Sequence, residues 1–532
     1  MKMLKNKACV LLAILMVFSS IWSTSTTPLT AKADDGAKVT LKIANCEDYI
    51  DEDLLDAFEE EYPNIDVVYS TYATNEILYN ELVINPSSYD IVVPSEYMIE
   101  KLAAENRIKK LDQTKITGYT DNVSPFIKGV LDNIKFTPKN GTESMLSEYM
   151  VGYMWGTMGW VYNTAVVDVE DVKSWSGVFK NSKYNKRATL KDSVRDTYLV
   201  GLAMTFEDEL KEIVATGGDD MNAKITEVLN RTDIASIEKV GDTLSSVKPK
   251  LYAFEVDSGK NDIITGKIDA YVAWSGDAAY AIDVALGYVE DDDGSFVSET
   301  KPLDYYIPEE GSNIWFDGMV IPSASRNDDA CYKFMEFISR PENVAQNMNY
   351  IGYTSMVAGD VIYNDIVLDW FDEFENYLED LGYDLETLSD SDIETLYENT
   401  TELELNEYGY QTVDLSYFFT GDESGDYTVI VSEESFGRLM AQYPTEEIVK
   451  RCAVMSYFDG DELLALNEMW ETVKGETFPL WLILVIFAGV ILLGAGIVLY
   501  RNKDKIKWLK LPERKKTYAE RKGLKVISRE EL

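Results

Sequence analysis

Residues 39–106 alternate strand-like and helix-like segments, and this order restricts the possible fold more than any other feature of the chain. Short runs rich in β-branched and aromatic residues are followed by amphipathic segments of helix-forming residues. The expected strands are 39–45, 65–72 and 89–95, and the expected helices are 51–63, 75–83 and 96–106. This order predicts a parallel sheet covered by helices, with ligands bound at the carboxyl ends of the strands. Those ends carry the turns 46–49 and 95–97.

Two later segments each place a tryptophan shortly before an aspartate. In 271–277 (YVAWSGD), a short strand leads through Trp274 to Asp277 at the start of a helix-like segment. In 314–322 (IWFDGMVIP), Trp315 and Asp317 stand at the head of another apolar run. An aromatic ring attracts an organic cation and packs on its methylene groups, while a carboxylate accepts the ammonium hydrogen bonds. The pairing indicates a site for an elongated cation, and core tryptophans beside surface acids are the alternative.

The stretch 150–163 (MVGYMWGTMGWVYN) is rich in glycine and aromatic residues and predicts an extended strand that crosses into a second lobe. Helical spacing at 194–206 and 221–229 belongs to that lobe, and 315–322 is expected to cross back. Two α/β lobes joined in this way leave a ligand cleft between them. We expect lobe 1 at about 38–155 and 315–350, and lobe 2 at about 160–313 and 353–475.

Both ends of the chain carry hydrophobic segments. Residues 1–33 combine lysines, an apolar run and an A-x-A sequence, which is typical of a signal peptide. The uncharged stretch 478–500 is long enough, at about 1.5 Å per residue, to span roughly 30 Å of hydrocarbon as one C-terminal transmembrane helix. The tail 501–532 is basic, so it is expected in the cytoplasm, with 34–477 outside the cell or in the periplasm.

The chain contains no histidine, and only Cys46, Cys331 and Cys452 remain after removal of the leader. This composition excludes the usual zinc sites and any Ser-His or Cys-His catalytic pair. We expect no cofactor and no metal. Three cysteines allow one disulfide, which the sequence does not assign, and reduced packing residues are the favoured interpretation. A net charge of −44 makes nucleic acid an unsuitable partner and favours cationic ligands weakly.

Several longer motifs follow one another in a characteristic order: NCEDYI, STYATNEILYNEL, YDIVVPSEYMIEKL, LKDSVRD, AYVAWSGDAAYA, NIWFDGMVIP, FISRPENVAQNMNYIGYTS and YPTEEIVKRC. In these motifs the chain resembles the polyamine-binding (spermidine/putrescine) solute-binding proteins of ABC importers. The resemblance covers about 41–354 and resumes at about 443–474. It implies a two-lobed periplasmic-binding-protein fold of type II, a putrescine or spermidine ligand, ABC permease subunits as partners, and no enzymatic activity.

The resemblance also implies roles for individual residues. Aromatic rings flank the polyamine chain, with Trp274 and Trp315 against its methylene groups. Asp317 holds one terminal ammonium group, Asp196 lies towards the other end, and Asp277 matches an acid of the putrescine-type members. The implied ligand-binding residues are Glu47, Asp48, Tyr49, Ser95, Tyr97, Asp196, Trp274, Asp277, Trp315, Asp317 and Tyr353.

One departure from the family lies in the turn 46–49, which follows the first expected strand. Where the family often has tryptophan followed by threonine or serine, this chain has Cys46 and Glu47. The aromatic rings and carboxylates around the ligand, here called the cage, are therefore expected to include one aromatic ring fewer and one negative charge more at this turn. The preferred polyamine length therefore stays open.

Residues 358–442 have no clear counterpart in the family and are rich in Asp, Glu and Tyr. Periodic aromatic residues within this acidic insertion predict an amphipathic acidic helix pair. A solvated charged face and an added docking surface are both compatible with this pattern. The insertion lacks the calcium-loop pattern of an EF-hand, so no calcium site is predicted.

Three functions remain compatible with the sequence. A membrane-tethered receptor that captures polyamines for an ABC permease accounts for most of the features. A sensory or adhesive ectodomain could use the same fold. An exported carbohydrate-active enzyme could use paired acids flanked by tryptophans, although no nucleophile motif is present.

Overall fold

The computed structural model describes residues 38–139, 141–286, 302–422, 424–458 and 460–475. The chain divides into two compact units, Met1–Asn467 and Glu468–Leu532. In the second unit, the described residues form the last turns of helix α25 (Gly460–Lys474). The expected leader, membrane span and basic tail lie outside the described residues. No helix within the described part is both long and apolar enough to cross a bilayer.

The amino-terminal region confirms the predicted alternation of strands and helices. Its elements are β1 (Val39–Cys46), α2 (Asp53–Glu61), β2 (Ile65–Tyr72), α3 (Asn75–Ile84), β3 (Ile91–Val92) and α4 (Glu96–Ala104). The strands form a parallel sheet in the order β2-β1-β3. Thr74 caps α3 by accepting a hydrogen bond from the Ile77 N–H group. The apolar face of α2, with Leu54 and Phe58, is buried in the core.

A second sheet has eight strands, in the order β15-β11-β6-β9-β7-β8, with β10 and β12 also paired to β6. Its strands are β6 (Val151–Asn163), β7 (Ala188–Lys191), β8 (Ala253–Glu255), β9 (Ala270–Trp274), β10 (Leu303–Tyr306), β11 (Ser312–Met319), β12 (Thr354–Ser355) and β15 (Cys452–Ala453). The predicted crossover strand is therefore β6, and it is buried over almost its whole length. The small hairpin of β4 (Lys135–Phe136) and β5 (Ser144–Met145) precedes it.

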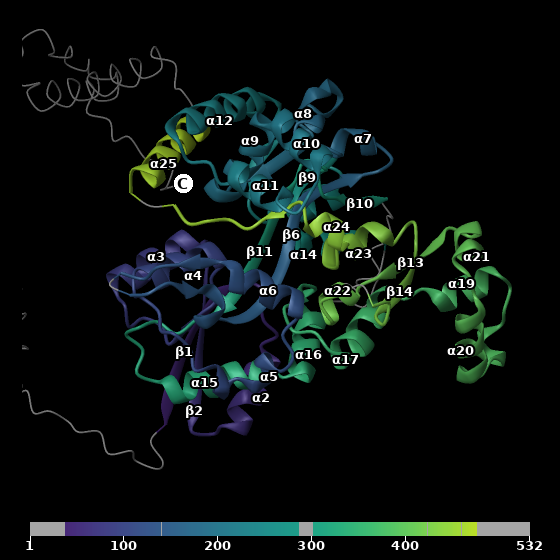
Figure 1. Ribbon diagram of the computed structural model, residues 1–532, viewed down its shortest axis with the longest axis horizontal. Coiled ribbons are helices and arrows are strands. Elements are labelled where there is room, and N and C mark those ends of the chain that lie inside the picture. Colours follow the sequence, from purple (N-terminus) through teal and green to yellow (C-terminus); the bar gives the residue numbers. More distant parts are fainter. Residues whose placement is uncertain (1–37, 140, 287–301, 423, 459, 476–532) are drawn as a thin grey trace, which may run out of the picture. The chain divides into compact units, whose positions relative to one another are not determined.

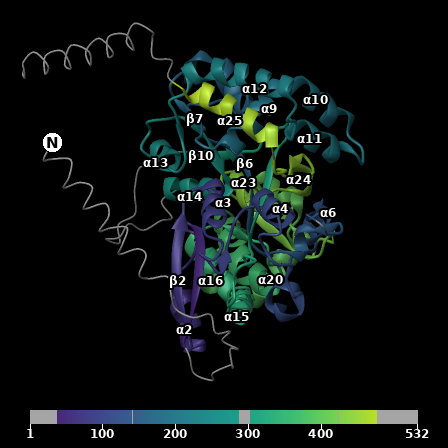
Figure 2. The same ribbon diagram turned by 90° about the vertical axis from the view of Figure 1, so that its left-hand side faces the viewer.

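Helices pack around both sheets. Besides α2–α4, the first 150 residues contribute helices α5 (Thr117–Thr120) and α6 (Pro125–Asn133). The chain after β11 contributes α15 (Asp328–Ile338) and α16 (Pro341–Ile351). The helices around β7–β9 are α7 (Val169–Val172), α8 (Gly177–Lys180), α9 (Val194–Thr205), α10 (Glu207–Thr216), α11 (Met221–Leu229), α12 (Ile234–Val247), α13 (Ser258–Ile264) and α14 (Ser275–Leu286). Figure 1 shows β6 and β11 running between the helices around β1–β3 and those around β7–β9, and Figure 2 shows β6 in this position from the side.

The first sheet is joined to β11 by isolated antiparallel bridges. One pairs Val92 with Val320, and another pairs Ser95 with Asp317. Strand β11 also pairs antiparallel with β6, which continues to β9 and β10. Two α/β regions, each organised around its own strands, are thus connected through β6 and β11, as the sequence predicts.

The acidic insertion is more elaborate than the predicted helix pair. It contains α17 (Asp360–Ile362), α18 (Leu368–Phe371), α19 (Phe374–Asp380), α20 (Asp390–Asn399), α21 (Glu402–Glu407), β13 (Tyr410–Asp414), α22 (Ser416–Phe419), β14 (Thr428–Ser432) and α23 (Phe436–Gln442), followed by α24 (Glu446–Val449). The helix-pair prediction missed the antiparallel ribbon β13-β14. Phe374, Tyr377 and Leu378 pack with Leu405, Tyr410 and Ile430 in a small separate core, and Figure 1 shows α19–α21 beyond β13 and β14.

Candidate functional site

Three aromatic side chains and one carboxylate predicted for the site lie together. The Tyr49 hydroxyl donates a hydrogen bond to Asp317 Oδ2 over 2.9 Å. The ring of Tyr49 meets that of Tyr353 edge-on at 5.1 Å between centroids, and Tyr353 lies 6.0 Å from Trp315. The three rings therefore pack in sequence, with Tyr353 between Tyr49 and Trp315. The structure thus brings these four residues, which are distant in the chain, into one group.

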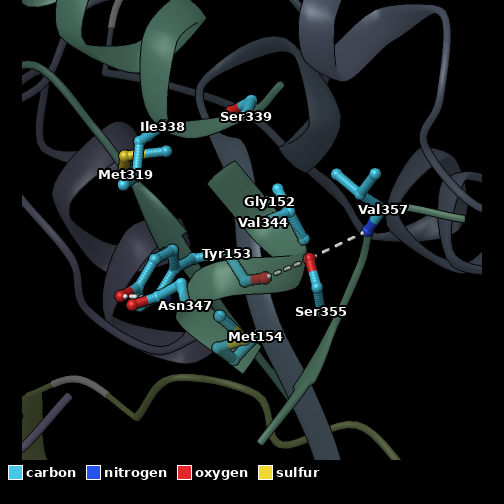
Figure 3. A pocket seen from close by; sticks show the side chains of 10 residues that line it. All are labelled: Gly152, Tyr153, Met154, Met319, Ile338, Ser339, Val344, Asn347, Ser355 and Val357. Atoms are coloured by element: carbon cyan, nitrogen blue, oxygen red, sulfur yellow. Dashed lines mark hydrogen bonds between the residues drawn. The ribbon is translucent and has the colours of Figure 1, made fainter. Parts of the chain in front are cut away.

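Side chains of β6 and α16 form hydrogen bonds with the turn that carries Tyr49. The Tyr153 hydroxyl donates to the Tyr49 carbonyl oxygen, and Asn347 Nδ2 donates to that hydroxyl over 2.8 Å. Asn347 Oδ1 also accepts from the Asp51 N–H group at 2.8 Å. Tyr153 and Asn347 line a small cavity, shown in Figure 3, together with Gly152, Met154, Met319, Ile338, Ser339, Val344, Ser355 and Val357. None of the predicted ligand-binding residues lines this cavity, so the cavity is separate from the cluster.

Asp317 lies at an irregularity inside β11, where the register with β6 shifts between Phe316 and Gly318. The sequence places it at the head of an apolar run, whereas the strand begins five positions earlier, at Ser312. A bulge of this kind re-aims a side chain, and here the carboxylate points to Tyr49 and Ser95. Burial raises the pKa of Asp317 to about 6, and the hydrogen bonds from Ser95 and Tyr49 only partly oppose this rise.

Glycines allow the aromatic walls to approach the backbone. A Cβ atom on Gly156 in β6 would clash with Ser275 Oγ and would lie 2.6 Å from the Trp315 ring. A Cβ atom on Gly276 would clash with the Tyr353 ring. Trp315 is fixed further by its indole N–H group, which donates to the Thr157 carbonyl oxygen at 3.2 Å. The positions of the two rings therefore require glycine at both sites.

Trp274 and Asp277 lie at the predicted junction, where β9 ends and α14 begins. Asp277 is buried, and its Oδ1 accepts a hydrogen bond from the Tyr353 hydroxyl at 3.2 Å. Two lysines pair with this carboxylate, Lys191 Nζ at 3.5 Å from Oδ2 and Lys260 Nζ at 3.5 Å from Oδ1. The ammonium group of Lys191 also lies 4.0 Å from the centroid of the Trp274 ring. A cation of the protein itself thus contacts both members of this Trp-Asp pair.

Asp196 lies between the two Trp-Asp pairs in its interactions, since Trp274 hydrogen-bonds it and its charge acts on Asp317. It stands in the first turn of α9, which Ser193 caps through its side chain. Burial raises the pKa of Asp196, against the opposing effects of hydrogen bonds from Ser193 and Trp274 and of the nearby Lys191. The negative charge of Asp196 in turn contributes to the raised pKa of Asp317. The two carboxylates are therefore close enough to repel each other.

The remaining predicted residues lie at the periphery. The Tyr97 hydroxyl donates to Glu76 Oε1 at 3.0 Å, and the Arg195 guanidinium lies 5.5 Å from the Tyr97 ring. Glu47 and Asp48 follow β1 directly but are exposed. The structure does not bring these two carboxylates into the buried cluster.

Three buried ionisable residues of the site are missing from the sequence-based set. Lys191 is 1% exposed and ends β7. Glu96 accepts from the Phe316 N–H group at 2.9 Å, and burial raises its pKa to about 8. Arg195 donates through Nη2 to the Ser456 carbonyl oxygen at 2.7 Å and lies over the Phe458 ring. Lys191 and Arg195 both fall within the quoted LKDSVRD motif, which was the available signal.

The arrangement suits recognition of a small cation. Aromatic rings and buried carboxylates lie together in this cluster, and an alkylammonium group requires both kinds of contact. Within the described residues, no group of three or more Cys, Asp or Glu side chains is placed to hold a metal ion. The described Cys46, Cys331 and Cys452 are free thiols.

Comparison with known proteins finds relatives that are named as spermidine- or putrescine-binding periplasmic proteins. The spermidine/putrescine-binding periplasmic protein of Escherichia coli K12 is 29% identical over 324 residues, covering 61% of this chain and 78% of that protein. The putrescine-binding periplasmic protein PotF of the same organism is 28% identical over 325 residues, covering 59% of this chain and 77% of its own length.

Solved structures show the same fold. The spermidine/putrescine ABC transporter substrate-binding protein PotD from Streptococcus pneumoniae, in complex with calcium and HEPES, is 26% identical, with a TM-score of 0.50 and coverage of 82% of this chain and 99% of that chain. The TpPotD lipoprotein of Treponema pallidum, at 17% identity, shares the fold with a TM-score of 0.52 over 82% of this chain and 99% of its own. These likenesses confirm the two-lobed periplasmic-binding-protein-like architecture.

The sequence profile of one family matches residues 53–359, which is more than half of the chain. This range contains most of the first sheet, β6, both Trp-Asp pairs and Tyr353. The chain therefore belongs to the bacterial extracellular solute-binding proteins.

Proposed function

We propose that this protein binds a small aliphatic polyamine, putrescine or spermidine, outside the cytoplasm and delivers it to the permease of an ABC importer. Relatives named for binding spermidine and putrescine support this ligand class. The chemistry of the candidate site also supports it, since the carboxylates of Asp317 and Asp277 are hydrogen-bonded by Tyr49 and Tyr353, whose rings contact each other. The family consists of solute-binding proteins, so we propose a receptor and not an enzyme.

The observation that carries the proposal is the environment of Asp317. This carboxylate is 8% exposed, and its hydrogen bonds come from the neutral hydroxyl groups of Tyr49 and Ser95. Among the described residues, no lysine or arginine forms an ion pair with it. A buried carboxylate without a counter-charge is costly, and a ligand ammonium group would supply that charge. The rings of Trp315 and Tyr353 then pack on the adjoining methylene groups.

We propose the following ligand-binding set: Glu47, Asp48, Tyr49, Ser95, Tyr97, Asp196, Trp274, Asp277, Trp315, Asp317 and Tyr353. In this proposal Asp317 and Asp196 attract ammonium groups, and the rings enclose the alkyl chain. Glu47 and Asp48 are exposed, so they act at the rim by attracting the cation before it enters.

Titration calorimetry and thermal unfolding of the purified protein with putrescine, spermidine and spermine test the proposal. A specific ligand stabilises the folded state by RT ln(1 + [L]/Kd), about 2.7 kcal/mol at a hundredfold excess over Kd. The expected result is saturable heat and a rise in Tm with at least one of these amines. Absence of any shift with all three would reject the ligand class.

We also propose that the protein is exported and tethered. Residues 1–33 would form the leader, 34–477 the external domain, 478–500 the membrane span and 501–532 a cytoplasmic tail, and the sequence alone supports these assignments. Protease added to intact cells should release the external domain, while a tag after Leu532 stays protected. A tag that antibodies reach from outside would contradict this topology.

A further inference from the structure

Lys191 is the most fully buried basic side chain of the site, with 1% of its surface exposed. Its ammonium group donates to the Val256 carbonyl oxygen at 2.8 Å. It also lies 3.5 Å from Asp277 Oδ2, 4.0 Å from Glu255 Oε1 and 4.0 Å from the Trp274 ring centroid. A carbonyl oxygen, carboxylates and an aromatic face are the groups that a bound alkylammonium ion requires.

Both oxygens of Asp277 are consequently engaged by the protein. Oδ2 faces Lys191, while Oδ1 faces Lys260 at 3.5 Å and accepts from the Tyr353 hydroxyl at 3.2 Å. Asp317, by contrast, is buried with neutral hydrogen-bond donors. The two Trp-Asp pairs of the sequence are therefore not equivalent. One pair already has a cation, and the other pair does not.

We propose that Lys191 is a built-in cation which fills one ammonium position of the cage, and thereby selects a short diamine over a longer triamine. This inference rests on the proposed polyamine-binding function. A diamine places one ammonium group at Asp317 and the other towards Asp196. A triamine brings a third ammonium group, but Asp277 is already paired with Lys191 at 3.5 Å, so this third group lacks a free carboxylate and meets the like charge of Lys191 among buried side chains.

The test compares binding of putrescine and spermidine to the wild-type protein and to Lys191→Met, which is one atom shorter, keeps an unbranched side chain and removes its charge. We expect the ratio of the spermidine to the putrescine association constant to rise at least about tenfold. Lys260→Met is the matched control, because Lys260 pairs with the same carboxylate but is 27% exposed. Its ratio should change by less than about threefold.

A double variant tests the mechanism and guards against misfolding. Lys191→Met with Asp277→Asn removes both charges of the buried pair, so it should fold even where the single variant is unstable. Since the vacated position then lacks its carboxylate, the spermidine gain of Lys191→Met should disappear. Thermal unfolding without ligand verifies the fold of each variant.

The outcomes separate the two proposals. Binding of neither amine to the wild-type protein overturns the proposed function and this inference with it. Wild-type binding with an unchanged ratio in a folded Lys191→Met variant, or a gain that persists in the double variant, overturns the inference alone. An equal rise of the ratio in Lys260→Met also overturns it, because a general loss of positive charge near Asp277 would then explain the effect.

Discussion

The hydroxyl group of Tyr49 hydrogen-bonds Asp317 Oδ2 at 2.9 Å across a separation of 268 positions in the chain. This contact joins the turn after β1 to the irregular part of β11. Because Tyr49 is neutral, it holds the carboxylate in place without neutralising its charge. The site is thus ready for a cation at a fixed position.

Replacement of Asp317 by asparagine tests this charge directly. The amide oxygen of the new side chain could still accept the Tyr49 hydrogen bond, so the fold should survive, but a ligand ammonium group would be buried without a counter-charge. We expect Asp317→Asn to weaken polyamine binding by about 2–4 kcal/mol in titration calorimetry. The control is Asp56→Asn, which removes an exposed acid of α2 outside the proposed set and should change the affinity by less than about 0.5 kcal/mol. Equal effects of both changes would contradict a specific role of Asp317.

Polyamine affinity should depend on pH. Burial raises the pKa of Asp317 to about 6 in the empty protein, and only the ionised form attracts an ammonium group. The association constant should therefore rise as the pH increases from about 5 to about 7. Titrations across this range provide the measurement. Asp317→Asn should flatten the profile, and an unchanged slope in that variant would assign the dependence to another acid, such as Asp196.

Stability without ligand should depend on Glu96. Burial raises the pKa of Glu96 from 4.5 to about 8 in the folded state, so the folded protein binds a proton that the unfolded chain has released. The free energy of unfolding should therefore decrease as the pH rises from about 4.5 to about 8. Glu96→Gln should remove this decrease, which is on the order of 2–4 kcal/mol. Denaturant unfolding at pH 5, 7 and 9 compares the two proteins, and parallel curves would contradict the assignment.

The aromatic walls should contribute less than the charge. Trp315→Ala removes a ring that packs beside Tyr353, and we expect a loss of about 1–3 kcal/mol in polyamine binding. Trp370→Ala in the acidic insertion is a matched control, since its indole N–H group contacts Asn349 away from the cluster. Calorimetry on both variants, at temperatures well below their Tm values, separates loss of binding from loss of fold. Identical affinities would exclude Trp315 from the site.

The sequence predicted most of the framework because periodicity and turn residues act locally. The three parallel strands, the long strand β6 and the junction at Trp274 lie where the patterns place them. The irregularity at Asp317 could not be predicted in this way, since it depends on the register between β11 and β6. The ribbon β13-β14 was missed because its strands are embedded in an acidic, aromatic sequence that also fits helices.

Lys191 shows why the charge balance of the site could not be predicted. A lysine after a short strand usually points to solvent, with its ammonium group hydrated. Its burial results from Val256, 65 positions later, and from Asp277, which α14 presents beside it. Such long-range partners leave no local signal. Conversely, the Trp-Asp pairing indicated Trp315 and Asp317, whereas Tyr49 and Tyr353 were added only through the resemblance to a family.

Strand β6 has a consequence for how the molecule unfolds. One end of it pairs with β11 and β12, and the other end pairs with β9 and β10. Neither α/β region can therefore lose its strand pairing without exposing the buried side chains of a strand that the other region shares. The described residues between 38 and 467 should unfold in one cooperative step, so that damage to the helices around β7–β9 also lowers the stability of the sheet β2-β1-β3.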